Sequence, residues 1–232
     1  MAETVTTVYF VRHGEAVSNV KGLYAGVTDV ELTQNGKDQL SFLEERFKDI
    51  ALDAVYTSPL QRARQTAEAL NRYPRAPLVE EAGLKEWNGG LWENARWDEL
   101  PTLYPKEWDL WEHALHLLRI PGGESLDEFA DRCLHTVERL VRENEGKTIA
   151  VSSHGGVLRV LLWLYKGNPR DSLSASFWHD NTSVSCVRFD GKGHSSVVLE
   201  NDISHLAEGM NTFAKFQWFL TEKEKKGYKH HE

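Results

Sequence analysis

Two histidines in this chain stand at the ends of predicted strands, and each is followed by a glycine. His13 comes after the run at residues 7–12, and His154 comes after the run at residues 148–152. Both runs are rich in β-branched or aromatic residues, a composition that favours strands. Ligands of α/β proteins usually bind at the carboxyl ends of parallel strands. We therefore expect the two imidazoles to lie at one edge of a sheet.

Two arginines belong to the same expected edge. Arg12 precedes His13, and Arg62 lies shortly after a further predicted strand at residues 53–57. Guanidinium groups match phosphate oxygens with paired hydrogen bonds, and helix N-termini also favour anions. The two arginines, the two histidines and the nearby helix starts therefore predict a pocket for a dianionic phosphate.

Such a pocket could carry out phosphoryl transfer. A neutral His13 can attack phosphorus to give a phosphohistidine, while Arg12, Arg62 and His154 neutralise charge on the phosphoryl oxygens. Because this reaction depends mainly on positioning and electrostatics, such a set suffices without a metal. The leaving alkoxide needs a proton, which a carboxyl group beside the pocket could donate and later recover from water.

Helices are predicted after the strands at residues 7–12 and 53–57. We expect one at residues 34–48 with Thr33 as its N-cap. We expect another to begin at Pro59 and end at Leu70, with Ser58 as its N-cap. Each of these helices follows a strand, which is the order expected of parallel strands joined by crossover helices.

The rest of the chain continues the alternation of strand and helix. Ser125 and Glu128 form a capping box before a long helix. Residues 183–189 and 195–199 predict a hairpin at a sheet edge. The whole pattern predicts an α/β fold, a three-layer α/β/α sandwich whose mostly parallel sheet has an antiparallel edge strand.

Composition excludes several classes of partner. The chain has 232 residues and a formal net charge of −8 at pH 7. This balance argues against binding to nucleic acid or to an anionic membrane, because both favour a basic surface. The apolar run at residues 160–165 is too short to span a bilayer. Cys133 and Cys186 cannot form a disulfide framework, so we expect a reducing, cytoplasmic environment.

We expect a single catalytic domain over residues 1–222 and a charged tail at residues 223–232. Residues 94–119 predict short helices or a cover over the sheet and are our candidate for a substrate lid. The five tryptophans from Trp87 to Trp111 belong to the core or this cover, with one or two lining the pocket. Aromatic walls would favour a bulky or apolar alcohol portion. The edge hairpin could also pair with a second copy in a homodimer.

Four motifs resemble those of the histidine phosphatase superfamily, in its phosphoglycerate-mutase-like branch. They are Arg12-His13-Gly14-Glu15 with Asn19, Ser58-Pro59-Leu60-Gln61-Arg62-Ala63, Gly122-Gly123-Glu124-Ser125 and Ser153-His154-Gly155. The resemblance runs from about Val8 to Leu199, and four ordered motifs are much more specific than the first alone. It implies a phosphoglycerate-mutase-like fold and phosphohistidine chemistry, with no metal and no organic cofactor.

The resemblance also implies roles for individual residues. His13 would be the phospho-acceptor, and Glu86 resembles the position of the general acid. The residues expected at the phosphate are Arg12, Asn19, Arg62, His154 and Gly155. Glu86 has glutamate neighbours such as Glu93, and a surface position is the competing interpretation of its role. We interpret Glu15 as a structural partner of nearby groups, not as a catalyst.

Three departures separate the chain from the mutases of this family. Mutases carry an adjacent pair of arginines in a long insertion, and residues 86–154 contain no such pair. Mutases carry Ser or Thr and then Gly-Trp where this chain has Ala25-Gly26-Val27, and typically Gly-Asn where it has Gly155-Gly156. We therefore expect a phosphomonoesterase acting on a small phosphorylated metabolite. A cofactor-dependent phosphoglycerate mutase and a non-catalytic phosphate-binding module are the alternatives.

Overall fold

The computed structural model describes residues 4–215, which form a six-stranded sheet in the order β3-β2-β4-β1-β5-β6. The strands are β1 (Val5–Arg12), β2 (Ala54–Thr57), β3 (Leu78–Glu80), β4 (Thr148–Ser153), β5 (Val184–Asp190) and β6 (Ser195–Asp202). β1 to β4 are mutually parallel, β5 runs antiparallel to β1, and β6 pairs antiparallel with β5. The predicted fold class and the predicted edge hairpin are both confirmed.

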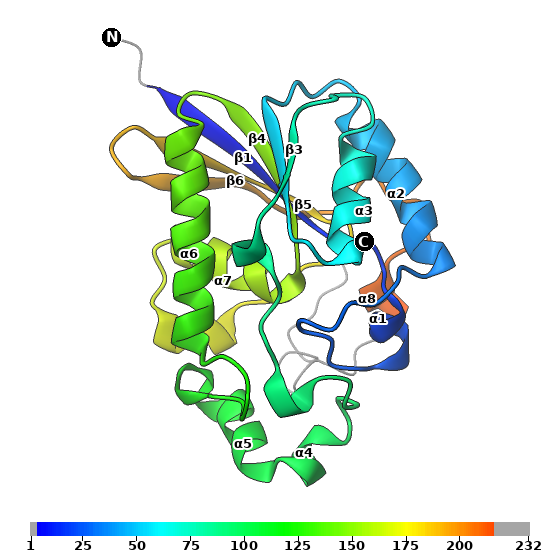
Figure 1. Ribbon diagram of the computed structural model, residues 1–232, viewed down its shortest axis with the longest axis vertical. Helices are drawn as coiled ribbons and strands as arrows, with labels where there is room; N and C mark the ends of the chain where they lie inside the picture. Colours follow the sequence, from blue (N-terminus) through cyan, green and yellow to red (C-terminus); the bar gives the residue numbers. More distant parts are fainter. Residues whose placement is uncertain (1–3, 216–232) are drawn as a thin grey trace.

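Helices cover both faces of this sheet (Figure 1). They are α1 (Val17–Lys21), α2 (Gln34–Phe47), α3 (Gln61–Leu70), α4 (Leu100–Leu103), α5 (Pro105–His113), α6 (Leu126–Glu143), α7 (Gly155–Tyr165) and α8 (Thr212–Lys215). Side chains of β1 alternate between the two faces, as a strand requires. Val11 packs with α2 and α3, whereas Val8 and Phe10 pack with α6 and α7.

Local hydrogen bonds fix the helix starts. The hydroxyl of Thr33 accepts the amide of Gly36 at 2.9 Å and caps α2, as predicted. The capping box of Ser125 and Glu128 at the start of α6 is likewise confirmed. The predicted start of α3 at Pro59 is wrong, because α3 begins at Gln61.

The serine expected to cap α3 has another partner. The hydroxyl of Ser58 lies 2.8 Å from Nε2 of His154, on the turn after β4. It also accepts the amide of Leu60 at 3.3 Å. Ser58 is fully buried. Its hydroxyl is therefore bonded to the turn after β4, and the helix starts two residues later than its sequence signal predicts.

Residues 94–119 fold into α4, α5 and a short 3-10 helix at Leu115–Leu117. They lie beyond the carboxyl ends of the parallel strands, at the foot of the molecule in Figure 1. Trp97, Trp111 and Leu118 of this segment are buried against the larger core cluster. In the described part of the chain, no helix is long and apolar enough to cross a membrane. The predicted charged tail, residues 223–232, lies outside the described residues.

Candidate active site

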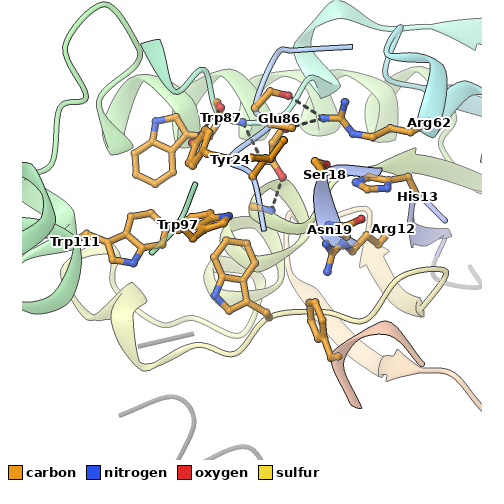
Figure 2. A pocket seen from close by; sticks show the side chains of 16 residues that line it. Arg12, His13, Ser18, Asn19, Tyr24, Arg62, Glu86, Trp87, Trp97 and Trp111 are labelled. Carbon is orange, nitrogen blue, oxygen red and sulfur yellow. Dashed lines mark hydrogen bonds between the residues drawn. The ribbon is translucent and has the colours of Figure 1, made fainter. Parts of the chain in front are cut away.

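The carboxyl ends of β1, β2 and β4 converge on one cavity. Arg12 ends β1, His13 follows it, and Arg62 lies in the first turn of α3 after β2. All three line the cavity, together with Asn19 and Glu86 (Figure 2). Five of the predicted site residues, drawn from four segments of the chain, are thus brought to a single cavity.

The ring of His13 is held as a neutral imidazole. Only 4% of His13 is exposed, and Nδ1 lies 2.7 Å from the carbonyl oxygen of Gly14. Since a carbonyl can only accept, Nδ1 carries the proton and Nε2 keeps its lone pair. Burial first, and then the charges of Arg62 and Arg12, hold the pKa of His13 well below 6.5. At neutral pH this ring is therefore an uncharged potential nucleophile.

His154 lies directly beside His13 but behind the cavity wall. The two ring centroids are 5.2 Å apart, and His154 is fully buried. Its Nε2 is paired with Ser58, while Nδ1 has no hydrogen-bond partner among the described residues. Burial, followed by the charge of Arg62, holds its pKa well below 6.5. Gly155 is also behind the wall, and a Cβ there would lie 3.3 Å from the guanidinium of Arg12.

Arg62 is fixed by main-chain carbonyl groups. Its Nη1 donates to the carbonyl of Thr28 at 2.8 Å, and its Nη2 donates to those of Ala25 at 3.0 Å and Gly26 at 2.8 Å. Burial lowers the pKa of Arg62 to about 10, so the guanidinium is still charged at neutral pH. The loop at residues 25–28 thus determines where this positive charge lies.

Glu93 holds that loop in place. Its Oε1 accepts the amides of Val27 at 2.9 Å and Gly89 at 3.0 Å. Its Oε2 accepts the amide of Thr28 at 3.1 Å and the hydroxyl of the same residue. One carboxylate therefore bonds three main-chain amides, and it braces the loop that positions Arg62. The sequence contains no signal that separates Glu93 from other glutamates.

Arg12 and Asn19 are tied to residues near the C-terminal end of the described chain. Arg12 donates to the carbonyl of His179, and its guanidinium lies 4.8 Å from the ring centroid of Phe213. Oδ1 of Asn19 accepts from Nδ2 of Asn181 at 3.3 Å. The same Asn181 amide donates to the carbonyl of His13 at 2.9 Å. No local sequence signal marks Asn181, because its contacts cross more than 160 residues.

Glu86 is a buried carboxyl group at the cavity. Its Oε1 accepts the amide of Trp87 and its Oε2 accepts the amide of Gly156, both at 2.9 Å. Burial raises the pKa of Glu86, although these amides and Arg62 oppose the shift. A Cβ at Gly156 would lie 2.4 Å from Oε1 of Glu86, so the glycine leaves room for the carboxyl group. A carboxyl group with a raised pKa is suited to donate a proton near neutral pH.

Glu15 has purely structural contacts. Its carboxylate accepts the hydroxyls of Thr33 at 2.6 Å and Thr212 at 2.9 Å and the amide of Asn35 at 3.0 Å. It is absent from the cavity lining. Within residues 4–215, no group of three or more His, Cys, Asp or Glu side chains is arranged to hold a metal ion.

Aromatic side chains form the rest of the cavity wall. Three of the five tryptophans that the sequence analysis assigned to core or cover line it: Trp87, Trp97 and Trp111. The lining also includes Tyr24, Trp178 and Phe213, which the sequence analysis did not single out. In Figure 2 the labelled tryptophans lie on the side of the cavity opposite His13, and Tyr24 lies between the tryptophans and His13.

The chain matches known proteins over most of its length. A sequence profile described as "Histidine phosphatase superfamily (branch 1)" matches residues 8–202. Phosphoserine phosphatase 1 of Hydrogenobacter thermophilus is 29% identical over 199 residues, which cover 85% of this chain and 93% of that protein. A metal-independent phosphoserine phosphatase of Arabidopsis thaliana is 34% identical over 160 residues, 68% of this chain and 67% of that one.

Solved structures of related proteins share the fold of this chain. YhfR of Bacillus stearothermophilus superposes with a TM-score of 0.82 at 34% identity, covering 86% of this chain and 98% of that one. The alpha-ribazole phosphatase of Shigella flexneri superposes with a TM-score of 0.76 at 27% identity, covering 84% and 96%.

Proposed function

Because the chain belongs to branch 1 of the histidine phosphatase superfamily, we propose that it hydrolyses a small phosphate monoester through a phosphohistidine on His13. The observation that carries this proposal is the state of the His13 ring. It is buried and neutral, its Nδ1 is occupied by a carbonyl, and two guanidinium groups stand at the same cavity. An imidazole in that state is a nucleophile that needs no separate base.

The first step transfers the phosphoryl group to the enzyme. Nε2 of His13 attacks phosphorus, an N–P bond forms, and the bond between phosphorus and the ester oxygen breaks. Glu86 donates its proton to the departing alkoxide, which leaves as a neutral alcohol. Arg12 and Arg62 stabilise the charge that develops on the non-bridging oxygens.

The second step regenerates the enzyme with water. The Glu86 carboxylate accepts a proton from the attacking water, the new oxygen bonds to phosphorus, and the N–P bond breaks. Inorganic phosphate leaves, and His13 and Glu86 return to their starting protonation states. The fixed charges of Arg12 and Arg62 serve the purpose that a metal cation serves in other phosphatases, so we propose that no metal takes part. Asn19 lines the same cavity and completes the proposed phosphate site, and we propose that His154 and the backbone at Gly155 support that site from directly behind its wall.

Hydrolysis, as opposed to transfer between two positions of one substrate, is supported by the lining of the cavity. A mutase must retain a carboxylated intermediate for the return step. The two arginines of the segment at residues 94–119 are engaged elsewhere: Arg96 pairs with Asp98 at 2.8 Å, and Arg119 pairs with Glu128 at 2.6 Å. Neither arginine belongs to the cavity lining. The names of the phosphatase relatives favour the same choice.

One experiment tests the proposal. The purified protein is incubated with p-nitrophenyl phosphate, and samples are quenched in alkali, which preserves a phosphohistidine. We expect phosphate release together with a trapped phosphohistidine that maps to residue 13, and we expect the His13→Ala variant to lose both. Phosphate release by His13→Ala at the wild-type rate would overturn the proposal. So would rapid isomerisation of 3-phosphoglycerate, with a trace of 2,3-bisphosphoglycerate and no phosphate release, because that result identifies a mutase.

A further inference from the structure

The cavity has two chemically different ends. Arg12, His13 and Arg62 lie at one end, where the phosphate is proposed to bind, and Trp97 and Trp111 lie at the other (Figure 2). The side chains that line the second end are apolar or aromatic. The second end therefore determines which alcohol portion of a phosphate ester fits the cavity.

The aromatic rings at that end support one another. The ring centroid of Trp111 lies 5.4 Å from that of Trp97, 6.1 Å from that of Trp87 and 6.3 Å from that of Trp178. The ring of Tyr24 lies 5.1 Å from that of Trp97. Aromatic pairs at these centroid distances are in favourable contact. The rings therefore form one continuous aromatic wall at this end of the cavity.

Positive charge is confined to the phosphate end. Of the described residues that line the cavity, Arg12 and Arg62 are the arginines, and none is a lysine. The one carboxyl group among these described lining residues is Glu86, which offers a substrate carboxylate no counter-charge. Arg159 approaches from behind, but its guanidinium lies 4.7 Å from the ring centroid of Trp178 and donates to Ser176. A second anionic group on the substrate would thus be desolvated against indole rings, without a counter-charge among the described lining residues.

We propose that the substrate is the phosphate monoester of an aromatic alcohol that carries no second anionic group. This inference rests on the proposed function, because it assumes that His13 and the arginines hold the phosphate. The ring of the alcohol packs against the aromatic wall formed by Tyr24, Trp97 and Trp111, and its ester oxygen faces Glu86. Phosphoserine, the substrate that the names of two relatives print, is a poor fit, because its carboxylate meets no cation in the described lining.

Four alkyl phosphates test the substrate class without changing the chemistry of the leaving group. They are benzyl phosphate, cyclohexylmethyl phosphate, phosphoserine and 3-phosphoglycerate, all of which release an alkoxide. We expect kcat/KM for benzyl phosphate to exceed that for phosphoserine and for 3-phosphoglycerate by about 100-fold, since an unpaired carboxylate must otherwise be buried. We expect cyclohexylmethyl phosphate to fall between them, because it fills the space but cannot stack.

Substitutions at Trp97 test the wall itself. We expect Trp97→Leu to lower kcat/KM for benzyl phosphate about tenfold, through KM, because one stacking partner is lost. Trp97→Phe should restore most of this loss, and the fold loss in Trp97→Leu should be larger for benzyl phosphate than for phosphoserine. Trp108→Leu is the matched control, because Trp108 belongs to the same segment but does not line the cavity. Its ring centroid lies 6.3 Å from that of Trp92.

Two outcomes would overturn the substrate class while leaving hydrolysis intact. One is turnover of phosphoserine as fast as that of benzyl phosphate. The other is an unchanged kcat/KM for benzyl phosphate in Trp97→Leu. Failure of the proposed function looks different, since no phosphate would be released from any of the four esters. In that case the Kd of benzylphosphonate, compared with that of the phosphonate analogue of phosphoserine, decides the specificity without turnover, and equal values would overturn it.

Discussion

The contacts of Glu93 make a sharp prediction about Arg62. In Glu93→Gln the side chain keeps its length, but one carboxylate oxygen becomes an NH2 group. Both oxygens of Glu93 accept main-chain amides, from Val27 and Gly89 on one side and from Thr28 on the other. Whichever way the glutamine amide turns, its NH2 group therefore faces a main-chain N–H that had donated to the carboxylate, and that hydrogen bond is lost. The loop at residues 25–28 must shift, and its carbonyl groups, which hold Arg62, shift with it.

The size of the effect follows from the number of bonds lost. A hydrogen bond to a charged acceptor contributes about 1.5–3 kcal/mol, and the better orientation of the glutamine loses at least one. If about 1.5 kcal/mol of this appears in phosphate binding, kcat/KM falls roughly tenfold, since each 1.36 kcal/mol is a factor of ten. We expect the Ki of inorganic phosphate to rise by a similar factor, because Arg62 is a proposed phosphate ligand.

The assay is competitive inhibition by phosphate, measured beside the thermal midpoint of each variant. Glu81→Gln is the control, because Glu81 is a part-buried carboxylate that pairs with Arg139 at 2.7 Å, away from the loop. We expect Glu81→Gln to change stability only modestly and to leave the Ki of phosphate unaltered. A Glu93→Gln protein with a lowered midpoint but an unchanged Ki would refute the link between Glu93 and Arg62, and would leave Glu93 with a purely structural role.

Three further predictions concern the proton donor and the nucleophile. Glu86→Gln should lower kcat about 100-fold or more for alkyl phosphates and much less for p-nitrophenyl phosphate, whose leaving group needs little protonation; equal losses would place the acid elsewhere. Gly156→Ala should have the same selective effect with a nearly unchanged thermal midpoint, because the new Cβ displaces the carboxyl group of Glu86; full activity on benzyl phosphate would show that this group need not stay in place. The pKa of His13 is lowered and that of Glu86 is raised, and both shifts widen the pH range in which the nucleophile is deprotonated while the acid is still protonated. The kcat for alkyl phosphates should accordingly fall as pH rises through the pKa of Glu86, and this alkaline fall should be absent in Glu86→Gln; a kcat that rises steadily from pH 5 to pH 9 would contradict both assignments.

Much of the fold could be predicted because its signals are local. The capping signals at Thr33 and Ser125 act within three residues, and the composition of residues 7–12 is enough to predict a strand there. The start of α3 was mispredicted because Ser58 is engaged by His154, a residue 96 positions away. A capping signal cannot reveal that a distant histidine competes for the same hydroxyl.

The site residues likewise divide into those that local motifs predict and those that depend on distant contacts. The motifs predicted that Arg12, His13 and Arg62 would meet, because parallel strands bring their carboxyl ends to one edge. Glu93 and Asn181 escaped notice, since their importance lies in which distant amides and carbonyls they reach. The aromatic wall was anticipated only in part for the same reason. Tryptophan at helical or loop positions has the same composition signal whether it fills a core or faces a ligand.

The bonds from Asn181 to the turn after β1 have a consequence for biogenesis. The carbonyl of His13 and the side chain of Asn19 are both secured by a residue that precedes β5. A chain emerging from the ribosome therefore contains its nucleophile early but lacks the hydrogen bonds that orient it until residue 181 has been made. Nascent or truncated chains that end before residue 181 should accordingly be catalytically silent, which would spare the cell premature hydrolysis by half-made enzyme.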